Sequence, residues 1–305
     1  MAVRRTDRQR RHQQHAGRGT DRRTPLARRC PCRAAPGDGR AARLAGGDAV
    51  TLHLARIGIH VHALAGFAVA RRLSDEDLGY ALHAALLARF GDAAPRPFRF
   101  LPDHEKGPHL LGYVHDRAEF ADAAALPPAD AVIDALFDGE PALRPMPERW
   151  REGARFGFEV RVRPVVRFGK SARAARTERD GGWLSGAGEI DANHAARERV
   201  ARAGGDPDTV DREAVYIDWL AKRLADAATL DHADLRHFRR TRTLRNTHRS
   251  EGRRTHRVEG PDALIGGTLT IADPAAFAAL LAKGIGRHSG FGYGMLLLAP
   301  PGRVG

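Results

Sequence analysis

The first half of the chain alternates apolar and polar residues and then switches to helical spacing. The alternation in TLHLARIGIHVHAL (residues 51–64) predicts a strand with one buried face. Ser74 is suited to cap a following helix, which has an acidic first turn and an end signal at Gly91. The predicted elements are strands at residues 51–64, 97–100 and 109–115, and helices at residues 74–90 and 117–126. Their order is β-α-β-β-α.

A similar pattern returns after a proline-rich stretch at residues 141–150, which we interpret as a linker. Asp211 is placed to cap one helix, and Pro274 stands at the first position of another. The predicted elements are strands at residues 154–168, 263–271 and 294–300, and helices at residues 211–226 and 273–284. The core positions expected on the first of these helices are Ala214, Ile217, Ala221 and Leu224.

With a hairpin strand between its two helices, the second half has the order β-α-β-β-α-β. Two consecutive units of this kind predict an α+β protein with two tandem ferredoxin-like (RRM-like) domains. Each domain would have an antiparallel sheet with helices on one face. We expect the N-terminal domain at residues 50–145 and the C-terminal domain at residues 146–305.

The first 49 residues differ from the rest in composition. Residues 1–50 contain 13 Arg and four Asp, so they carry nine of the 13 net positive charges of the chain. They lack a periodic apolar pattern, which predicts a disordered basic tail. Two explanations stay open: an arm that binds nucleic acid, or an upstream segment translated because the start codon is assigned too early.

Composition also limits the class of protein. No run of 18 apolar residues is present and the N-terminus lacks the apolar region of a signal peptide, which predicts a cytoplasmic protein without a membrane span. Cys30 and Cys32 are the only cysteines, so no disulfide framework is expected. Together with His12 and His15 they are a poor zinc motif, because a single residue separates the cysteines. We expect neither a metal nor a cofactor.

Tyr80 and His83 are the first candidates for chemistry. The core stripe of the helix predicted at residues 74–90 passes through Leu78 and Leu82, which leaves Tyr80 and His83 together on the face that does not pack. Both side chains exchange protons, and at this spacing they could hydrogen-bond one substrate together. The alternative is a pair of ordinary surface residues.

A glycine-rich loop is the second candidate. GIGRHSGFGYGMLLL (residues 284–298) contains five glycines in its first eleven residues. The uncovered backbone N–H groups of such a loop can approach a phosphate closely. A dinucleotide-binding loop would follow a strand and precede a helix, whereas here the helix comes first. A tight turn between helix and strand is the remaining alternative.

The third candidate is the basic segment LRHFRRTRTLRNTHRSEGRRTHR (residues 235–257), which holds nine arginines and one acid, Glu251. Thr and Arg alternate along it and SEG is suited to a turn, so the segment predicts a β-ribbon lined with guanidinium groups that binds nucleic acid. A solvated run of charge is the alternative. A weaker basic loop at residues 167–176 is expected to belong to the same surface.

Four passages carry a family resemblance: Y-A-L-H at residues 80–83, R-P-V-V-R at 163–167, R-E-A-V-Y-I-D-W-L-A at 212–221, and G-I-G-R-H-S-G-F-G-Y-G at 284–294. From about Val50 to its end, the chain resembles the CasE family, the CRISPR type I-E endoribonucleases that cut the repeat hairpin of precursor CRISPR RNA. The resemblance implies two ferredoxin-like domains, cleavage without metal, and retention of the cut RNA as a subunit of the Cascade complex. The implied partners are the repeat hairpin RNA and the other Cascade subunits.

The resemblance also implies site residues. Tyr80 and His83 occupy the catalytic Tyr-x-x-His positions. The residues expected to bind RNA are Arg163, Arg167, Lys170, Arg173, Arg239, Arg240, Arg242, Arg245, Arg249, Gly284, Gly286, Arg287, His288, Ser289, Gly292 and Gly294. Two features depart from the family: Ser289 replaces a frequent lysine, and the residues before Val50 have no counterpart.

The chemistry implied for this site is consistent with the residue types. RNA carries its own nucleophile, the 2′-OH, so cleavage needs proton transfer and support for the negative charge at phosphorus. An imidazole, with an ordinary pKa of about 6.5, suits either proton transfer, and a phenol suits hydrogen bonding to the phosphate. Which of His83 and Tyr80 takes the 2′-OH proton stays open.

Two other functions stay open as well. One is a catalytically inactive RNA-binding subunit of the same fold, in which Tyr80 and His83 only contact RNA. The other is a DNA-binding or architectural protein, which would bind duplex DNA and show no dependence on the 2′-OH.

Overall fold

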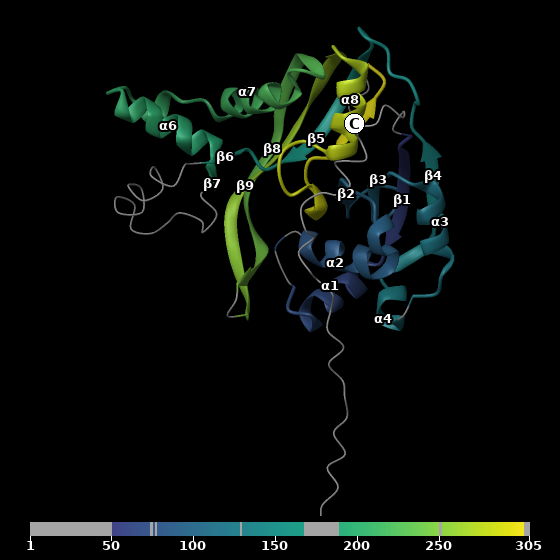
Figure 1. Ribbon diagram of the computed structural model, residues 1–305. Helices are drawn as coiled ribbons and strands as arrows, with labels where there is room; N and C mark the ends of the chain where they lie inside the picture. The colour runs from purple at the N-terminus through teal and green to yellow at the C-terminus, as the bar shows by residue number, and fades with distance from the viewer. Residues whose placement is uncertain are drawn as a thin grey trace, which may run out of the picture. The chain divides into compact units, whose positions relative to one another are not determined.

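The computed structural model describes residues 51–73, 76, 78–128, 130–167, 189–249 and 252–301, and for residues 245–249 and 252–258 it describes the backbone alone. All of these residues belong to one unit of the chain, Arg40–Gly305 (Figure 1). The predicted tail at residues 1–49 and the basic loop with Lys170 and Arg173 lie outside the described residues. No helix in the described part is long and apolar enough to cross a membrane.

The first half forms one antiparallel sheet. Its elements are β1 (His53–Ile59), α1 (Val61–Ala70), α2 (Gly79–Phe90), η2 (Gly91–Ala93), β2 (Phe98–Leu101), β3 (His109–Val114), α3 (Arg117–Ala125), α4 (Ala131–Asp134) and β4 (Phe137–Pro145). The strand order is β2-β3-β1-β4, with the first and third strands in the centre as in a ferredoxin-like sheet. Leu82 and Leu86 of α2 share a buried apolar cluster with Ile57 of β1 and Phe98 of β2, so the helices cover one face of this sheet.

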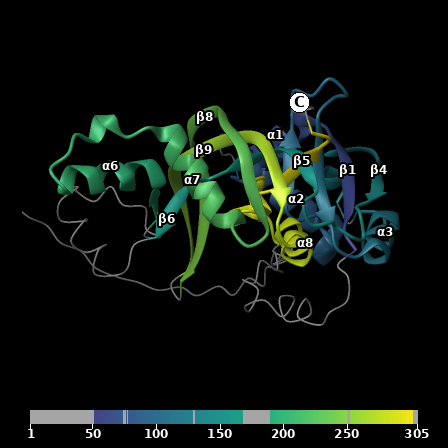
Figure 2. The same cartoon turned by 90° about the horizontal axis from the view of Figure 1, so that it is seen from above.

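The second half repeats the arrangement. Its elements are β5 (Arg155–Val162), β6 (Val165–Arg167), β7 (Glu189–Asp191), α6 (Ala192–Arg202), η3 (Pro207–Thr209), α7 (Arg212–Leu224), β8 (Ala228–Arg249), β9 (Gly252–Ile271), α8 (Pro274–Lys283), η4 (Ser289–Phe291) and β10 (Leu296–Ala299). The main sheet has the order β10-β5-β9-β8, and β6 pairs with β7 separately. Helix α7 lies beside β8 (Figure 2). The predicted α+β fold with two ferredoxin-like sheets is confirmed.

Three boundaries in the first half were predicted wrongly. β1 ends at Ile59, and the residues predicted to extend it begin α1. α2 begins at Gly79 because Leu78 has a left-handed backbone with φ 55°, so the predicted cap at Ser74, which lies outside the described residues, does not start the helix. Residues 141–150 are not a linker throughout, because the stretch begins inside β4. β4 is an edge strand, where prolines are tolerated.

The cap predicted for α7 is confirmed, but of the four predicted core positions only Leu224 is buried. The Asp211 carboxylate accepts hydrogen bonds from the first backbone N–H groups of the helix. The buried side chains are Tyr216, Trp219, Leu220 and Leu224. Ala214 is exposed, and Ile217 and Ala221 are half-buried. Two large rings bury more apolar surface than two alanines, so they decide which face packs.

The long strand predicted at residues 154–168 is two strands in different sheets. β5 pairs with β9 and β10, whereas β6 pairs with β7. Pro164 separates them, and a proline provides no backbone N–H for a ladder. In β5, Phe158 and Val160 are buried against α7 and α8, while Glu159 and Arg161 lie half-buried on the opposite face of the sheet.

The basic segment forms a hairpin, as predicted. β8 and β9 pair from Ala228 with Ile271 to Arg249 with Gly252, and residues 250–251 between the two strands lie outside the described residues. β5 pairs with β9 only up to Ala263, so beyond that residue the hairpin continues as a two-stranded ribbon (Figure 1).

Candidate functional site

Tyr80 and His83 lie in the first two turns of α2, and the glycine-rich loop between α8 and β10 packs against them. The Phe291 ring stacks on Tyr80 with the centroids 5.5 Å apart, and it lies 4.6 Å from the His83 ring. The centroids of Tyr80 and His83 are 6.3 Å apart. The prediction that both lie on an unpacked face is wrong, since the loop covers this face and leaves both side chains half-buried.

The glycine-rich loop approaches His83 through its backbone. A Cβ added to Gly290 would lie 3.5 Å from His83 Nδ1 and 3.9 Å from Arg96 Cδ. The side chains of His83 and Arg96 therefore converge on the same short stretch of main chain. At Gly294, φ is 77° and a Cβ would collide with the backbone of Ile285, so this turn of the loop requires glycine.

The surroundings of His83 favour its neutral form. Burial and, to a smaller extent, the positive charge of Arg96 lower the pKa of His83 to about 4, although a backbone hydrogen bond with Gly290 acts in the opposite direction. At pH 7 the imidazole is therefore uncharged in the free protein. A neutral imidazole can accept a proton.

Arg96 is a site residue that the sequence analysis missed. Its backbone is held on both sides, because its N–H donates to the Tyr113 carbonyl at 2.9 Å and its own carbonyl accepts from His115 Nε2 at 3.0 Å. No ion pair of its guanidinium is present among the described residues. An arginine before a strand gave no signal in the sequence; only the fold brings it to His83.

Arg287 and His288, both predicted to bind RNA, contact an acid in this structure. Arg287 Nη1 lies 2.5 Å from Glu189 Oε1, and His288 Nε2 lies 4.0 Å from the other carboxylate oxygen. Glu189 is buried at the start of β7. These contacts fasten the glycine-rich loop to the β6–β7 hairpin. Ser289 begins the short helix η4, next to Gly290.

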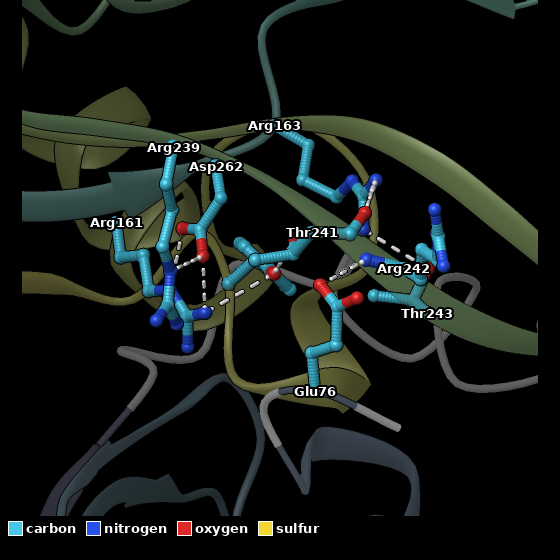
Figure 3. A network of polar contacts seen from close by, with 9 residues as sticks. Glu76, Arg161, Arg163, Arg239, Thr241, Arg242, Thr243 and Asp262 are labelled. Atoms are coloured by element: carbon cyan, nitrogen blue, oxygen red, sulfur yellow. Dashed lines mark hydrogen bonds and ion pairs between the residues drawn. The ribbon is translucent and has the colours of Figure 1, made fainter.

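Arginines at the base of the β8–β9 ribbon form a network of charges (Figure 3). Asp262 accepts hydrogen bonds from Arg239 Nε at 2.9 Å and Arg161 Nε at 2.7 Å. Arg161 also donates to the Tyr293 hydroxyl at 3.2 Å, and Thr241 Oγ1 lies 3.3 Å from the same oxygen. Because Tyr293 belongs to the glycine-rich loop, the network joins this loop to the ribbon.

Arg163 is buried beneath the ribbon rather than exposed for a ligand. Only 3% of its surface is accessible. It donates from Nη1 to Thr243 Oγ1 at 2.9 Å and from Nη2 to the Thr241 carbonyl at 3.3 Å (Figure 3). In this structure Arg163 positions β8.

Two other ribbon arginines share one carboxylate. Arg240 Nε donates to Glu259 at 2.6 Å, and Arg242 Nε donates to the second oxygen of Glu259 at 3.5 Å. Both arginines remain more than half exposed. Their hydrogen bonds lower the pKa of Glu259, so its carboxylate is ionised at neutral pH. The basic segment at residues 235–257 ends two positions before this acid.

The segment before α2 contacts the ribbon. The Arg242 backbone N–H donates to Glu76 Oε2 at 2.9 Å, and the Glu76 N–H donates to the Arg242 carbonyl at 3.4 Å (Figure 3). Leu244 of β8 is buried in the apolar cluster of the first half. The ribbon is therefore attached both to the start of the helix with His83 and to the glycine-rich loop.

The remaining predicted RNA contacts are placed only in part. Arg167 is exposed at the end of β6. Arg245 and Arg249 continue the ribbon along β8, where the structure describes their backbone alone. Within the described ranges, no group of three or more His, Cys, Asp or Glu residues is placed to hold a metal ion.

Residues 52–300 match the model of a family described as "CRISPR associated protein". The search of curated proteins found no match.

Two similar solved structures each cover 82% of this chain. The structure of the CRISPR endoribonuclease Cse3 bound to 19-nt RNA has 17% sequence identity and a TM-score of 0.52, over 82% of this chain and 100% of that one. Thermus thermophilus Cse3 bound to an RNA representing a pre-cleavage complex has 17% identity and a TM-score of 0.50, with the same coverage. At this identity the likeness shows a shared fold. Because the family match spans most of the sequence, the chain belongs to the family of CRISPR-associated proteins.

Proposed function

We propose that the chain is an endoribonuclease that cleaves the repeat hairpin of precursor CRISPR RNA and retains the mature RNA in a Cascade complex. The observation that carries the proposal is the convergence of His83, Tyr80 and Arg96 on the glycine-rich loop. The family match supports a role in a CRISPR system, and the fold shared with RNA-bound Cse3 structures supports an RNA substrate.

Cleavage proceeds by attack of the 2′-oxygen on the adjacent phosphorus. The bond from the 2′-oxygen to phosphorus forms, the bond from phosphorus to the 5′-oxygen breaks, and the products are a 2′,3′-cyclic phosphate and a 5′-OH. His83 takes the 2′-OH proton, because its lowered pKa keeps the imidazole neutral at pH 7. Nδ1 lies against Gly290, so Nε2 is the nitrogen that receives this proton. The leaving 5′-oxygen takes up a proton from the imidazolium or from water.

The other groups at the site stabilise the negative charge that develops on the phosphate. The guanidinium of Arg96 lies beside His83 and supplies positive charge that Ser289 does not. Tyr80 hydrogen-bonds the phosphate and lies in the first turn of α2, where backbone N–H groups favour an anion. Since the nucleophile is part of the RNA, no step requires a metal ion.

RNA binding rests on the ribbon and the glycine-rich loop. Arg239, Arg240 and Arg242 contact phosphates, and Arg245 and Arg249 extend this surface along β8. Arg167, Lys170 and Arg173 add positive charge after β5. The division into domains at residues 50–145 and 146–305 stays part of this proposal.

The test uses the full chain and the repeat hairpin from its own locus. Cleavage in EDTA that leaves a 2′,3′-cyclic phosphate is the expected result. A hairpin with 2′-H at the nucleotide before the cut should bind normally and remain intact. Undiminished cutting of this deoxy substrate would overturn the mechanism. Tight binding of the natural hairpin without any cutting would support the inactive RNA-binding subunit instead.

A further inference from the structure

Arg99 of β2 lies where the two sheets meet, on the faces that are turned away from their helices. Its neighbours Phe98 and Phe100 are buried on the helix side of the first sheet, so alternation places Arg99 on the other face. Arg99 Nη2 lies 3.8 Å from Glu159 Oε1 of β5, which lies on the face of the second sheet that is turned away from α7 and α8. His83 lies on the helix side, so this location is distinct from the site described above.

Four arginines surround two carboxylates here. Arg99 and Arg236 contact opposite oxygens of Glu159, and the second distance is 3.4 Å. Arg161 and Arg239 share Asp262 in the same way. A third acid, Asp234, contacts Arg236 and is 45% exposed. Even with all three acids counted, the group keeps at least one positive charge.

The charge of Arg99 is buried and incompletely satisfied. Its side chain is 13% exposed, and its Nε has no hydrogen-bond partner in the part of the chain that the structure describes. Burial and the nearby charge of Arg161 lower the pKa of Arg99 to about 10. Burial of a positive charge is unfavourable, and so is burial of a donor without an acceptor. An anion bound beside Arg99 would compensate the charge and accept the hydrogen bond from Nε.

The second sheet makes room for this arrangement. Gly266 stands opposite Glu159 in the β5–β9 pairing. A Cβ on Gly266 would collide with the guanidinium of Arg236, which lies flat across the strand at this position. The missing side chain lets Arg236 reach Glu159.

We propose that Arg99, Arg161, Arg236 and Arg239 bind a phosphate group of the RNA backbone outside the cleaved bond. Guanidinium groups match the oxygens of a phosphodiester in charge and geometry. Arg239 is 48% exposed and lies where the basic ribbon begins. An RNA strand that extends beyond the ribbon therefore reaches these four arginines next. The identity of the ligand as RNA rests on the proposed function.

The first test is Arg99→Gln in the full chain. Binding is measured by fluorescence anisotropy with a deoxy, uncleavable hairpin that carries single-stranded flanks. We expect affinity to fall about tenfold and the salt dependence to become shallower by about one unit of slope. The matched control is Arg155→Gln, because Arg155 begins β5, the strand that contains Glu159, and pairs with Asp231 while 58% exposed. We expect it to bind within about twofold of the parent chain.

A second test has the opposite sign. Glu159→Gln removes a carboxylate that competes with phosphate for Arg99 and Arg236, so binding should strengthen several-fold. A purely structural ion pair would give no gain in affinity. Unchanged or weaker RNA binding by Glu159→Gln, in a chain with normal thermal unfolding, would overturn the proposal.

The third test does not require a stable Arg99 variant. Single phosphates of the RNA are replaced in turn by neutral methylphosphonates, and the parent chain is assayed. At one phosphate other than the cleaved one, the replacement should weaken binding about tenfold. Glu159→Gln should enlarge the loss of affinity at this phosphate. If no phosphate outside the cleaved bond is sensitive to replacement, these arginines do not bind the RNA backbone. Competition by inorganic phosphate together with this absence would show an anion site that RNA does not use. These tests measure binding of an uncleavable RNA, so they do not depend on catalysis. If the chain did not cleave RNA, the proposed nuclease function would be wrong, but the binding results would still test the phosphate site.

Discussion

The protein has two basic regions that differ in how their charge is used. At the His83 site, Arg96 stands beside an uncharged imidazole, and no acid pairs with its guanidinium among the described residues. At the base of the ribbon, Arg239 pairs with Asp262, and Arg240 and Arg242 share Glu259. The ribbon has more arginines than the His83 site. Those at its base, however, are paired with acids, whereas Arg96 is not paired with an acid among the described residues. Charge that acts on a reacting phosphate must not already be neutralised.

The two regions are linked through the glycine-rich loop. Phe291 packs on Tyr80 and His83, and Tyr293, two residues later, contacts Arg161 and Thr241 at the ribbon. The surface of the ribbon is therefore fixed relative to His83, which the proposed binding of RNA there requires. Predictions that separate catalysis from binding test this comparison directly.

Loss of the His83 imidazole should have the largest effect. His83→Ala is expected to lower single-turnover cleavage about 10²–10⁴-fold, which is the usual contribution of a positioned acid or base. RNA affinity should stay within about threefold, because one half-buried ring contributes little binding area. Rates are measured with protein in excess over labelled hairpin.

The matched control is His104→Ala, since His104 is an exposed histidine in the turn between β2 and β3. It should cleave at the parent rate. Parent-like cleavage by His83→Ala under saturating protein would show that this helix does not hold the active site.

The pH dependence of folding should report the buried imidazole. The pKa of His83 in the folded chain, about 4, lies below its unfolded value of about 6.5, so the unfolded chain takes up a proton first as pH falls. The stability contributed by this group is complete above pH 6.5 and is lost towards pH 4, by at most about 3 kcal/mol. His83→Gln should lack this component. Denaturant unfolding of both chains at several pH values measures the difference, and identical pH profiles would contradict a buried neutral His83.

Removal of the charge next to His83 should affect catalysis and leave binding nearly unchanged. Arg96→Gln is expected to lower the cleavage rate about 10–100-fold, as for loss of one group that stabilises a transition-state charge. Arg96→Lys should retain part of the rate. Arg96→Gln should also raise the pKa of His83, because the positive charge that lowers it is removed. An NMR titration can follow this change. Arg117→Gln, in an exposed part of α3, is the control. A loss of affinity as large as the loss of rate would place Arg96 in binding instead.

The fold was largely predictable because its signals are local. The Asp211 cap and Pro274 marked the starts of α7 and α8 correctly. Alternation indicated where strands lie, although it did not give the end of β1 or the break between β5 and β6. Packing was harder to predict: the glycine-rich loop covers the face of α2 that helical spacing leaves open. The aromatic ring of Phe291 was visible in the loop, but nothing local showed that it would stack on Tyr80.

Pairing across strands was the main source of error about charge. The basic segment at residues 235–257 contains a single acid, because Glu259 and Asp262 lie just beyond its end. In the hairpin these acids stand opposite Arg242 and Arg239. Arg99 was missed for a similar reason, since its partner Glu159 is 60 residues away in the sequence. Such contacts depend on sheet register, which the sequence pattern did not provide.

Loss of ribbon arginines should weaken binding without changing the cleavage rate at saturation. Replacing Arg239, Arg240 and Arg242 together with Gln is expected to lower RNA affinity about tenfold and to flatten its salt dependence. The change of slope should be smaller than three units, because Asp262 and Glu259 already neutralise part of this charge. Anisotropy titrations at several salt concentrations measure it. A loss of cleavage at saturating protein would show that these side chains act in catalysis.

The smallest effect should come from Glu259→Gln, and its sign should be opposite. This substitution releases Arg240 and Arg242 from their shared carboxylate, which is ionised because their hydrogen bonds lower its pKa. RNA affinity should rise about two- to fivefold and the salt dependence should steepen, since two more positive charges are available to phosphates. Glu152→Gln, at an exposed acid before β5, is the control and should leave binding unchanged. Equal affinity of Glu259→Gln and the parent chain would mean that pairing does not limit the ribbon's charge, and that the contrast with Arg96 has another cause.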